Sequence, residues 1–199
     1  QEREKVKNMK RSFDSRVDYS LLLPVFCLLV IGVVAIYIAV SHDYPNNVLP
    51  ILGQQIAWIA LGLVIGFVVM FFNTEFLWKV TPYLYGLGLA LMVLPLVFYN
   101  PSLVASTGAK NWVSIGGTTL FQPSEFMKIS YILMLARVIV QFTQKHKEWR
   151  RTIPLDFLLI IWMIGFTIPV LVLLALQSDL GTALVFVAIF AGMVLLSGV

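Results

Sequence analysis

The sequence has few charged residues and almost no cysteine or histidine. Asp, Glu, Lys and Arg make up 12% of its 199 residues, whereas a soluble domain has about twice that share. This shortage excludes an ordinary soluble globular domain. The single cysteine, Cys27, lies in an apolar run, so the chain has no internal disulfide framework. With one cysteine and two histidines, the sequence offers no cluster typical of a transition-metal site.

The net charge of +4 does not indicate a nucleic-acid partner. The basic residues gather in short segments that flank apolar runs, which is the pattern of a membrane protein rather than of a basic binding face. Hydrophobic residues make up 59% of the chain. The composition therefore predicts an integral membrane protein.

Six apolar segments are long enough to cross a bilayer, which takes about 20 helical residues. Helix is the expected state because backbone polar groups in lipid must pair within their own segment. The sequence thus predicts an all-α, polytopic membrane protein. No cleavage site follows the first segment, so it is expected to be retained as a span. The predicted spans are 19–40, 48–72, 78–99, 123–142, 155–176 and 180–199.

The distribution of lysine and arginine predicts a cytoplasmic N-terminus. In that orientation the basic residues between spans lie inside, and Lys110 is the exception. Residues 1–18 then form a cytoplasmic tail and residues 19–199 a transmembrane domain. Loop 100–122 and the turn at 177–179 are expected on the outer side, so the polar motifs of the chain collect on one face of the membrane.

The long loop carries its own turn residues. Its sequence includes WVSIGGTTLF, which predicts a short hairpin turning at Gly116 and Gly117. Two interpretations stay open. In one, the loop lies at the membrane interface and is anchored by Trp112. In the other, it shapes a site, as long loops with defined turns commonly do.

The loop runs into the next span through FQPSEFMK, which places Glu125 and Lys128 in the first turns of an apolar helix. Pro123 suits the first helical position, and Glu125 suits the positive end of the helix dipole. Lys128 gains nothing from that end, although the i, i+3 spacing lets the two side chains pair. One interpretation is a self-neutralising pair whose lysine reaches the headgroups. We favour the other, in which both face a cavity, because ionisable groups in spans usually do.

The turn before the last span has the sequence QSDLGT. Ser178 or Asp179 is expected to cap the following helix, and Gly181 allows close helix packing. A cap alone is one interpretation of Asp179; a second carboxylate near Glu125 is the other. Arg137 is expected to extend its side chain towards the headgroups.

GAKNWVSIGGTTLFQPSEFMKISYILMLA and QSDLGTALVFVAIFAGMVLLSGV together resemble the shape, elongation, division and sporulation (SEDS) family, which includes RodA, FtsW and SpoVE. The resemblance runs over essentially the whole chain from about Asp14. Two departures are visible. Many members have a basic residue where this chain has Asn111, and many have proline where it has Ser178.

The resemblance implies a multi-pass protein of the bacterial cell membrane with about ten spans. It implies a peptidoglycan glycosyltransferase of cell-wall synthesis, needed for cell shape or division, that polymerises lipid II on the outer leaflet. Undecaprenyl pyrophosphate is the leaving group, and a class B penicillin-binding protein is the partner. The family's proposed catalytic aspartate follows the seventh span. We therefore expect this chain of six spans to be the N-terminal part of a larger domain, inactive by itself.

Lys128 is then a candidate to stabilise the departing pyrophosphate, and Glu125 to orient it or to help hold a divalent cation. No other cofactor is expected. Two rival functions remain: a lipid II flippase, which would need polar groups reaching both leaflets, and a non-catalytic scaffold. The candidate site residues are Glu125, Lys128 and Asp179 in supporting catalytic roles, and Lys110, Trp112, Gln122 and Ser124 in substrate binding.

Overall fold

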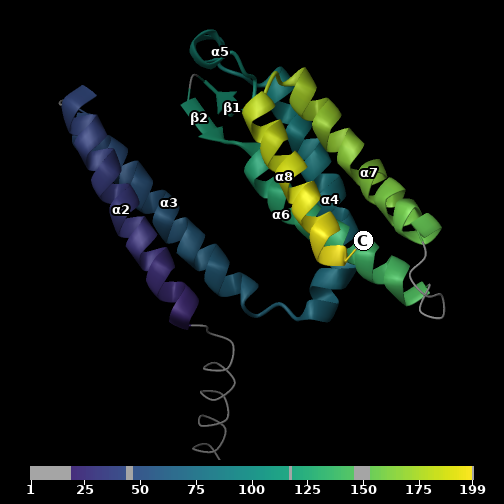
Figure 1. Cartoon of the computed structure of the whole chain (residues 1–199). Helices are drawn as coiled ribbons and strands as arrows, with labels where there is room; N and C mark the ends of the chain where they lie inside the picture. The colour runs from purple at the N-terminus through teal and green to yellow at the C-terminus, as the bar shows by residue number, and fades with distance from the viewer. Residues whose placement is uncertain (1–18, 44–46, 117, 146–152, 199) are drawn as a thin grey trace, which may run out of the picture. The chain divides into compact units, whose positions relative to one another are not determined.

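The structure is a computed structural model that describes residues 19–43, 47–116, 118–145 and 153–198. Each predicted span corresponds to one long helix, and the six helices are apolar enough to cross a membrane (Figure 1). The prediction of an all-α polytopic protein is confirmed. The predicted tail, 1–18, lies outside the described residues. The long helices are α2 Tyr19–Asp43, α3 Val48–Val69, α4 Thr74–Val97, α6 Pro123–Lys145, α7 Ile153–Leu176 and α8 Leu180–Ser197.

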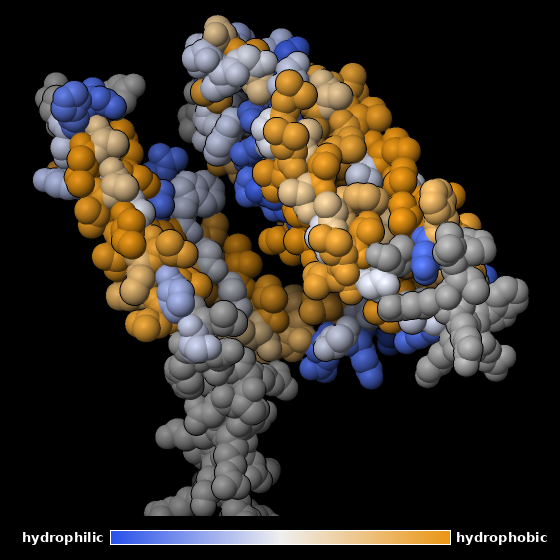
Figure 2. Space-filling model, in the orientation of Figure 1, coloured by the Kyte–Doolittle hydropathy of each residue, from blue (hydrophilic) through white to orange (hydrophobic). Residues whose placement is uncertain are grey.

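The chain divides into two compact units, Gln1–Asn73 and Thr74–Val199. In the first unit, α2 and α3 pack side by side as a helical hairpin (Figure 1). None of the residues of α3 is buried, and apolar side chains such as Leu28 and Ile56 are exposed. On the face that Figure 2 shows, most of the surface of this unit is hydrophobic. In water such a surface would drive aggregation, whereas a bilayer solvates it.

The second unit is a bundle of α4, α6, α7 and α8 in which α6 contacts each of the other three helices. The fully buried side chains of α6 include Met127, Tyr131 and Leu135, which recur at helical spacing and form one face. Gly88 of α4 lets α6 approach closely. A Cβ at Gly88 would lie 2.5 Å from the sulfur of Met127, so the two helices leave no room for a side chain there.

Polar contacts join these helices inside the bundle. The hydroxyl groups of Tyr131 and Thr167 lie 2.7 Å apart, and the Tyr85 hydroxyl donates to the Phe166 carbonyl at 2.5 Å. Arg137 donates to the Trp78 carbonyl, and its guanidinium lies 5.0 Å from the centre of the Trp78 ring. Near its start, α4 thus supplies both an acceptor and an aromatic face for Arg137. The expectation that Arg137 extends towards the headgroups stays a prediction.

The segment 100–122 forms three short elements at one end of the second unit, called the loop end (Figure 1). Helix α5, Pro101–Thr107, begins after Asn100, whose side chain accepts a hydrogen bond from the Ser102 N–H. Strands β1, Val113–Ile115, and β2, Thr118–Phe121, pair antiparallel. The predicted hairpin is confirmed, with Gly116 in the left-handed region at φ 60°, whereas α5 was not predicted.

Candidate functional site

Asp179 caps helix α8. The Thr182 N–H donates to Asp179 Oδ1 at 3.0 Å, and the Thr182 hydroxyl donates to Oδ2 at 2.7 Å. The sequence allowed either Ser178 or Asp179 as the cap, and the structure selects Asp179. Ser178 instead has φ 59°, a left-handed conformation that costs a non-glycine residue about 1–2 kcal/mol. A proline could not adopt this φ, so this turn differs from any that a proline at position 178 would allow.

The loop end also donates to Asp179. Asn111 Nδ2 lies 2.8 Å from Asp179 Oδ2, and Gln122 Nε2 lies 3.4 Å from the same oxygen. Asn111 precedes β1, and Gln122 connects β2 to α6. A single carboxylate therefore joins both ends of the hairpin to the first turn of α8. We call Asn111, Gln122, Asp179 and Thr182 the Asp179 cluster.

The cluster determines the charge state of its carboxylate. Asp179 is 8% exposed. This burial acts to raise the pKa of the Asp179 carboxyl, but hydrogen bonds from the Thr182 N–H, Asn111, the Thr182 hydroxyl and Gln122 outweigh it and lower the pKa below its ordinary value. Asp179 is consequently ionised at neutral pH. Hydrogen-bond donors from the surrounding segments stabilise its negative charge.

A second set of contacts anchors the loop to the same turn. The Lys110 N–H donates to the Gln177 carbonyl at 2.8 Å, and the buried Gln177 side chain donates to the Met92 carbonyl of α4 at 2.5 Å. The Lys110 ammonium lies 4.6 Å from the centre of the Tyr99 ring, within the range of a cation–π interaction. These contacts thus fix the backbone at Lys110 and place the Lys110 ammonium over the Tyr99 ring.

Glu125 and Lys128 form the predicted pair, with Lys128 Nζ 2.8 Å from Glu125 Oε2. The Glu125 side chain is 62% exposed and that of Lys128 is 26% exposed. The cavity that the pair was expected to face stays a prediction. Among the hydrogen bonds and ion pairs recorded for the described residues, none links this pair to Asp179. The two motifs share the loop end, but their carboxylates have separate partners.

The remaining candidates differ in accessibility. Trp112 is 37% exposed at the start of the hairpin and Gln122 belongs to the Asp179 cluster. Ser124 is 1% exposed, and its hydroxyl is buried without a hydrogen-bond partner among the described residues. A substrate could therefore reach Trp112 directly, whereas contact with Ser124 would require the surrounding side chains to move.

Sequence reasoning missed Asn111 and Thr182 as partners of Asp179. The signal for Asn111 was its position, where the resemblance to the SEDS family implies a basic residue in many members. An amide, a lysine and an arginine share the ability to donate to a carboxylate. Thr182 follows Asp179 by three residues, the ordinary spacing between a helix cap and the N–H that it accepts.

The carboxylates at the loop end do not form a metal-binding group. Within the described ranges, no group of three or more His, Cys, Asp or Glu side chains could hold a metal ion. Glu125 is engaged by Lys128 and Asp179 by its cluster. A divalent cation at either carboxylate would need additional ligands from elsewhere.

Comparison with known proteins finds relatives named RodA, FtsW and stage V sporulation protein E. The chain is 28% identical over 184 residues to a peptidoglycan glycosyltransferase RodA of Treponema pallidum, covering 92% of this chain and 39% of the relative. It is 30% identical over 193 residues to a probable peptidoglycan glycosyltransferase FtsW of Burkholderia thailandensis, covering 92% and 38%. It is 25% identical over 185 residues to stage V sporulation protein E of Bacillus subtilis, covering 91% and 48%.

The chain therefore spans about two fifths of the RodA and FtsW relatives named above. No solved structure matches it. The model of the FtsW/RodA/SpoVE family, described as cell cycle protein, matches residues 19–199 and so includes every described helix and the loop end. This chain is a multi-pass bacterial membrane protein that belongs to the FtsW/RodA/SpoVE family.

Proposed function

We propose that the full-length protein is a peptidoglycan glycosyltransferase that polymerises lipid II at the outer leaflet. The observation that carries this proposal is the family match over residues 19–199, together with relatives named for that activity. We further propose a RodA-type role in elongation, with an FtsW-type role in division as the alternative. A class B penicillin-binding protein is the proposed partner.

The chemistry of the loop end supports this reaction. Transfer of a glycosyl group from a lipid pyrophosphate requires cationic charge near the departing phosphates. Lys128 and Lys110 provide such charge at the loop end, and Glu125 holds the Lys128 ammonium. Trp112, two residues after Lys110 in the chain, is 37% exposed and offers an apolar face to a sugar ring or a prenyl chain.

Asp179 is better suited to positioning than to proton transfer. A general base works best when its pKa lies near the working pH, whereas hydrogen bonds lower the pKa of Asp179. Its oxygens already accept bonds from Asn111, Gln122 and Thr182. We therefore assign it the role of holding the hairpin against α8, and we expect the general base to come from another part of the full-length protein.

The proposed leaflet depends on the orientation predicted from the basic residues. Ile115 is exposed at the loop end, and Lys145 is at the far end of α6. In the full-length protein with Cys27 and any other cysteine replaced by serine, an impermeant thiol reagent should label I115C in intact cells. It should label K145C only after permeabilisation. The reverse pattern would overturn the assignment of the site to the outer leaflet.

The activity itself is tested with the full-length protein and its class B partner in proteoliposomes that contain fluorescent lipid II. The partner's transpeptidase is blocked with a β-lactam, so a ladder of glycan polymer reports glycosyl transfer alone. We expect polymer with the wild type and little with K128M. Movement of lipid II between leaflets without polymer would identify a flippase. Absence of both activities in a complex that still supports growth would indicate a scaffold.

A further inference from the structure

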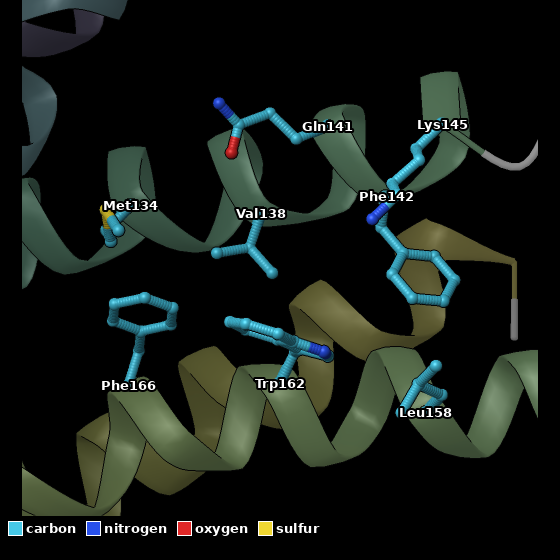
Figure 3. A pocket seen from close by; sticks show the side chains of 8 residues that line it. All are labelled: Met134, Val138, Gln141, Phe142, Lys145, Leu158, Trp162 and Phe166. Carbon is cyan, nitrogen blue, oxygen red and sulfur yellow. The ribbon is translucent and has the colours of Figure 1, made fainter.

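A groove lies between α6 and α7 in the half of the second unit away from the loop end. Its volume is about 310 Å³, which is within the range of small-molecule sites. The rings of Trp162 and Phe166 point from α7 towards Val138 of α6, and Phe142 points from α6 towards α7 (Figure 3). The floor and walls are therefore apolar and aromatic.

The groove is about as long as the hydrocarbon part of one leaflet is thick. Its lining on α6 runs from Met134 to Lys145, a span of about 16 Å at 1.5 Å per residue. Half the hydrocarbon core of a bilayer is about 15 Å thick. Lys145 is the last residue of a helix long enough to cross the membrane, so the groove extends from headgroup depth towards the middle of the bilayer.

Lys145 lines the groove at its membrane-surface end, one helical turn beyond Gln141. The Gln141 side chain extends back over Val138, with its amide oxygen on the side of Val138 (Figure 3). The indole nitrogen of Trp162 points towards the side where Phe142 and Leu158 lie (Figure 3). None of the residues that line the groove is acidic. In the part of the chain that the structure describes, Lys145 has no ion-pair partner.

We propose that this groove binds an anionic phospholipid of the bilayer, with one acyl chain against Trp162 and Phe166 and its phosphate at Lys145. The apolar walls suit a chain, and the Lys145 ammonium suits a headgroup that carries net negative charge, such as phosphatidylglycerol. The Trp162 indole N–H is placed to donate to an ester carbonyl, as tryptophans at membrane interfaces commonly do. This site is separate from the loop end.

The proposal is tested by photo-cross-linking on the full-length protein in nanodiscs. The probe is phosphatidylglycerol with a diazirine on one acyl chain, and the matched probe is phosphatidylethanolamine with the same chain. Mass spectrometry should locate the phosphatidylglycerol adducts on α6 and α7 at the groove. Adducts confined to other helices would overturn the proposal. Equal labelling by the two probes would overturn the assigned headgroup.

Variants separate this site from general attraction to the membrane. Replacing Lys145 by glutamine should reduce phosphatidylglycerol labelling of the groove about fivefold, whereas K145R should retain it. The control is K79Q, which removes an exposed lysine from the first turns of α4, outside the groove. L158W narrows the groove and should reduce labelling while Lys145 is intact. Equal losses of phosphatidylglycerol labelling in K145Q and K79Q would show that any nearby positive charge attracts the lipid. That result would overturn the proposed site.

Discussion

Asn111 Nδ2 lies 2.8 Å from Asp179 Oδ2, although 68 residues separate them in the chain. This contact fixes the loop end to the rest of the second unit, because it joins the segment before β1 to the cap of α8. A hydrogen bond to a charged group contributes about 1.5–3 kcal/mol. The position of the hairpin therefore depends on a carboxylate at the start of another helix.

We expect N111A to loosen the hairpin, because Asp179 loses one donor while its charge stays buried. Hydrogen exchange at the backbone amides of β1 and β2 should become faster. N111R should keep most of the protection, since arginine also donates to a carboxylate. The control is S106A, which removes a bond confined to α5. Unchanged exchange in N111A would contradict a holding role for this contact.

The Asp179 cluster should make stability depend on pH. Its hydrogen bonds lower the pKa of Asp179 in the folded state, so the unfolded chain binds the proton more readily. The cluster's contribution is then fully present above the ordinary pKa of an aspartate, about 4, and is lost as the pH falls through the lowered folded value. Thermal unfolding in detergent between pH 3 and 7 should show this loss in the wild type. D179N should remove that part of the pH dependence.

Replacing Ser178, in the turn between α7 and α8, by glycine should stabilise the folded protein. Ser178 has φ 59°, and glycine adopts this conformation without steric cost. S178G should therefore raise the free energy of unfolding by about 1 kcal/mol. S178A, which keeps the steric cost, is the matched control and should change little. S178P should lower stability, since proline cannot adopt a positive φ. A stabilising S178P would show that the turn takes another conformation.

Close packing of α4 on α6 predicts opposite outcomes at two nearby glycines. A Cβ at Gly88 would meet the Met127 sulfur at 2.5 Å, whereas one at Gly86 would meet nothing within 4 Å. G88A should lower stability by about 1–3 kcal/mol, the usual range for an overpacked core. G86A should be neutral or slightly stabilising, because alanine favours helix. Equal effects would show that Met127 moves aside at little cost.

The exposed pair at the start of α6 should matter more for activity than for stability. An exposed ion pair contributes about 0.2–1 kcal/mol, so E125L, K128M and the double variant should all accumulate in the membrane. In the full-length protein we expect each to lose lipid II polymerisation, because K128M removes the cationic charge needed at the departing pyrophosphate and E125L removes the carboxylate that holds it. A double variant that polymerises at the wild-type rate would show that the pair is structural.

The spans could be predicted because their signal is local. Apolar length alone indicates a membrane helix, and Gly116 indicates the hairpin turn. The Asp179 cluster could not be predicted in the same way, since Asn111 and Gln122 meet Asp179 only after four helices pack. Helix α5 was missed because seven residues, Pro101–Thr107, form too short a helix for a periodic pattern. That Glu125 and Lys128 face a cavity stays a prediction, because it depends on what lies beside α6 in the full-length protein.

The Asp179 cluster can form only late in synthesis. Asn111 and Gln122 leave the ribosome well before Asp179, because the chain is made from its N-terminus. The donors at both ends of the hairpin can find their acceptor only when α7 and the start of α8 have entered the membrane. Until then water must satisfy them. A ribosome-bound chain that ends before Asp179 would thus carry an inserted α6 beneath a hairpin that has not yet been fixed in place.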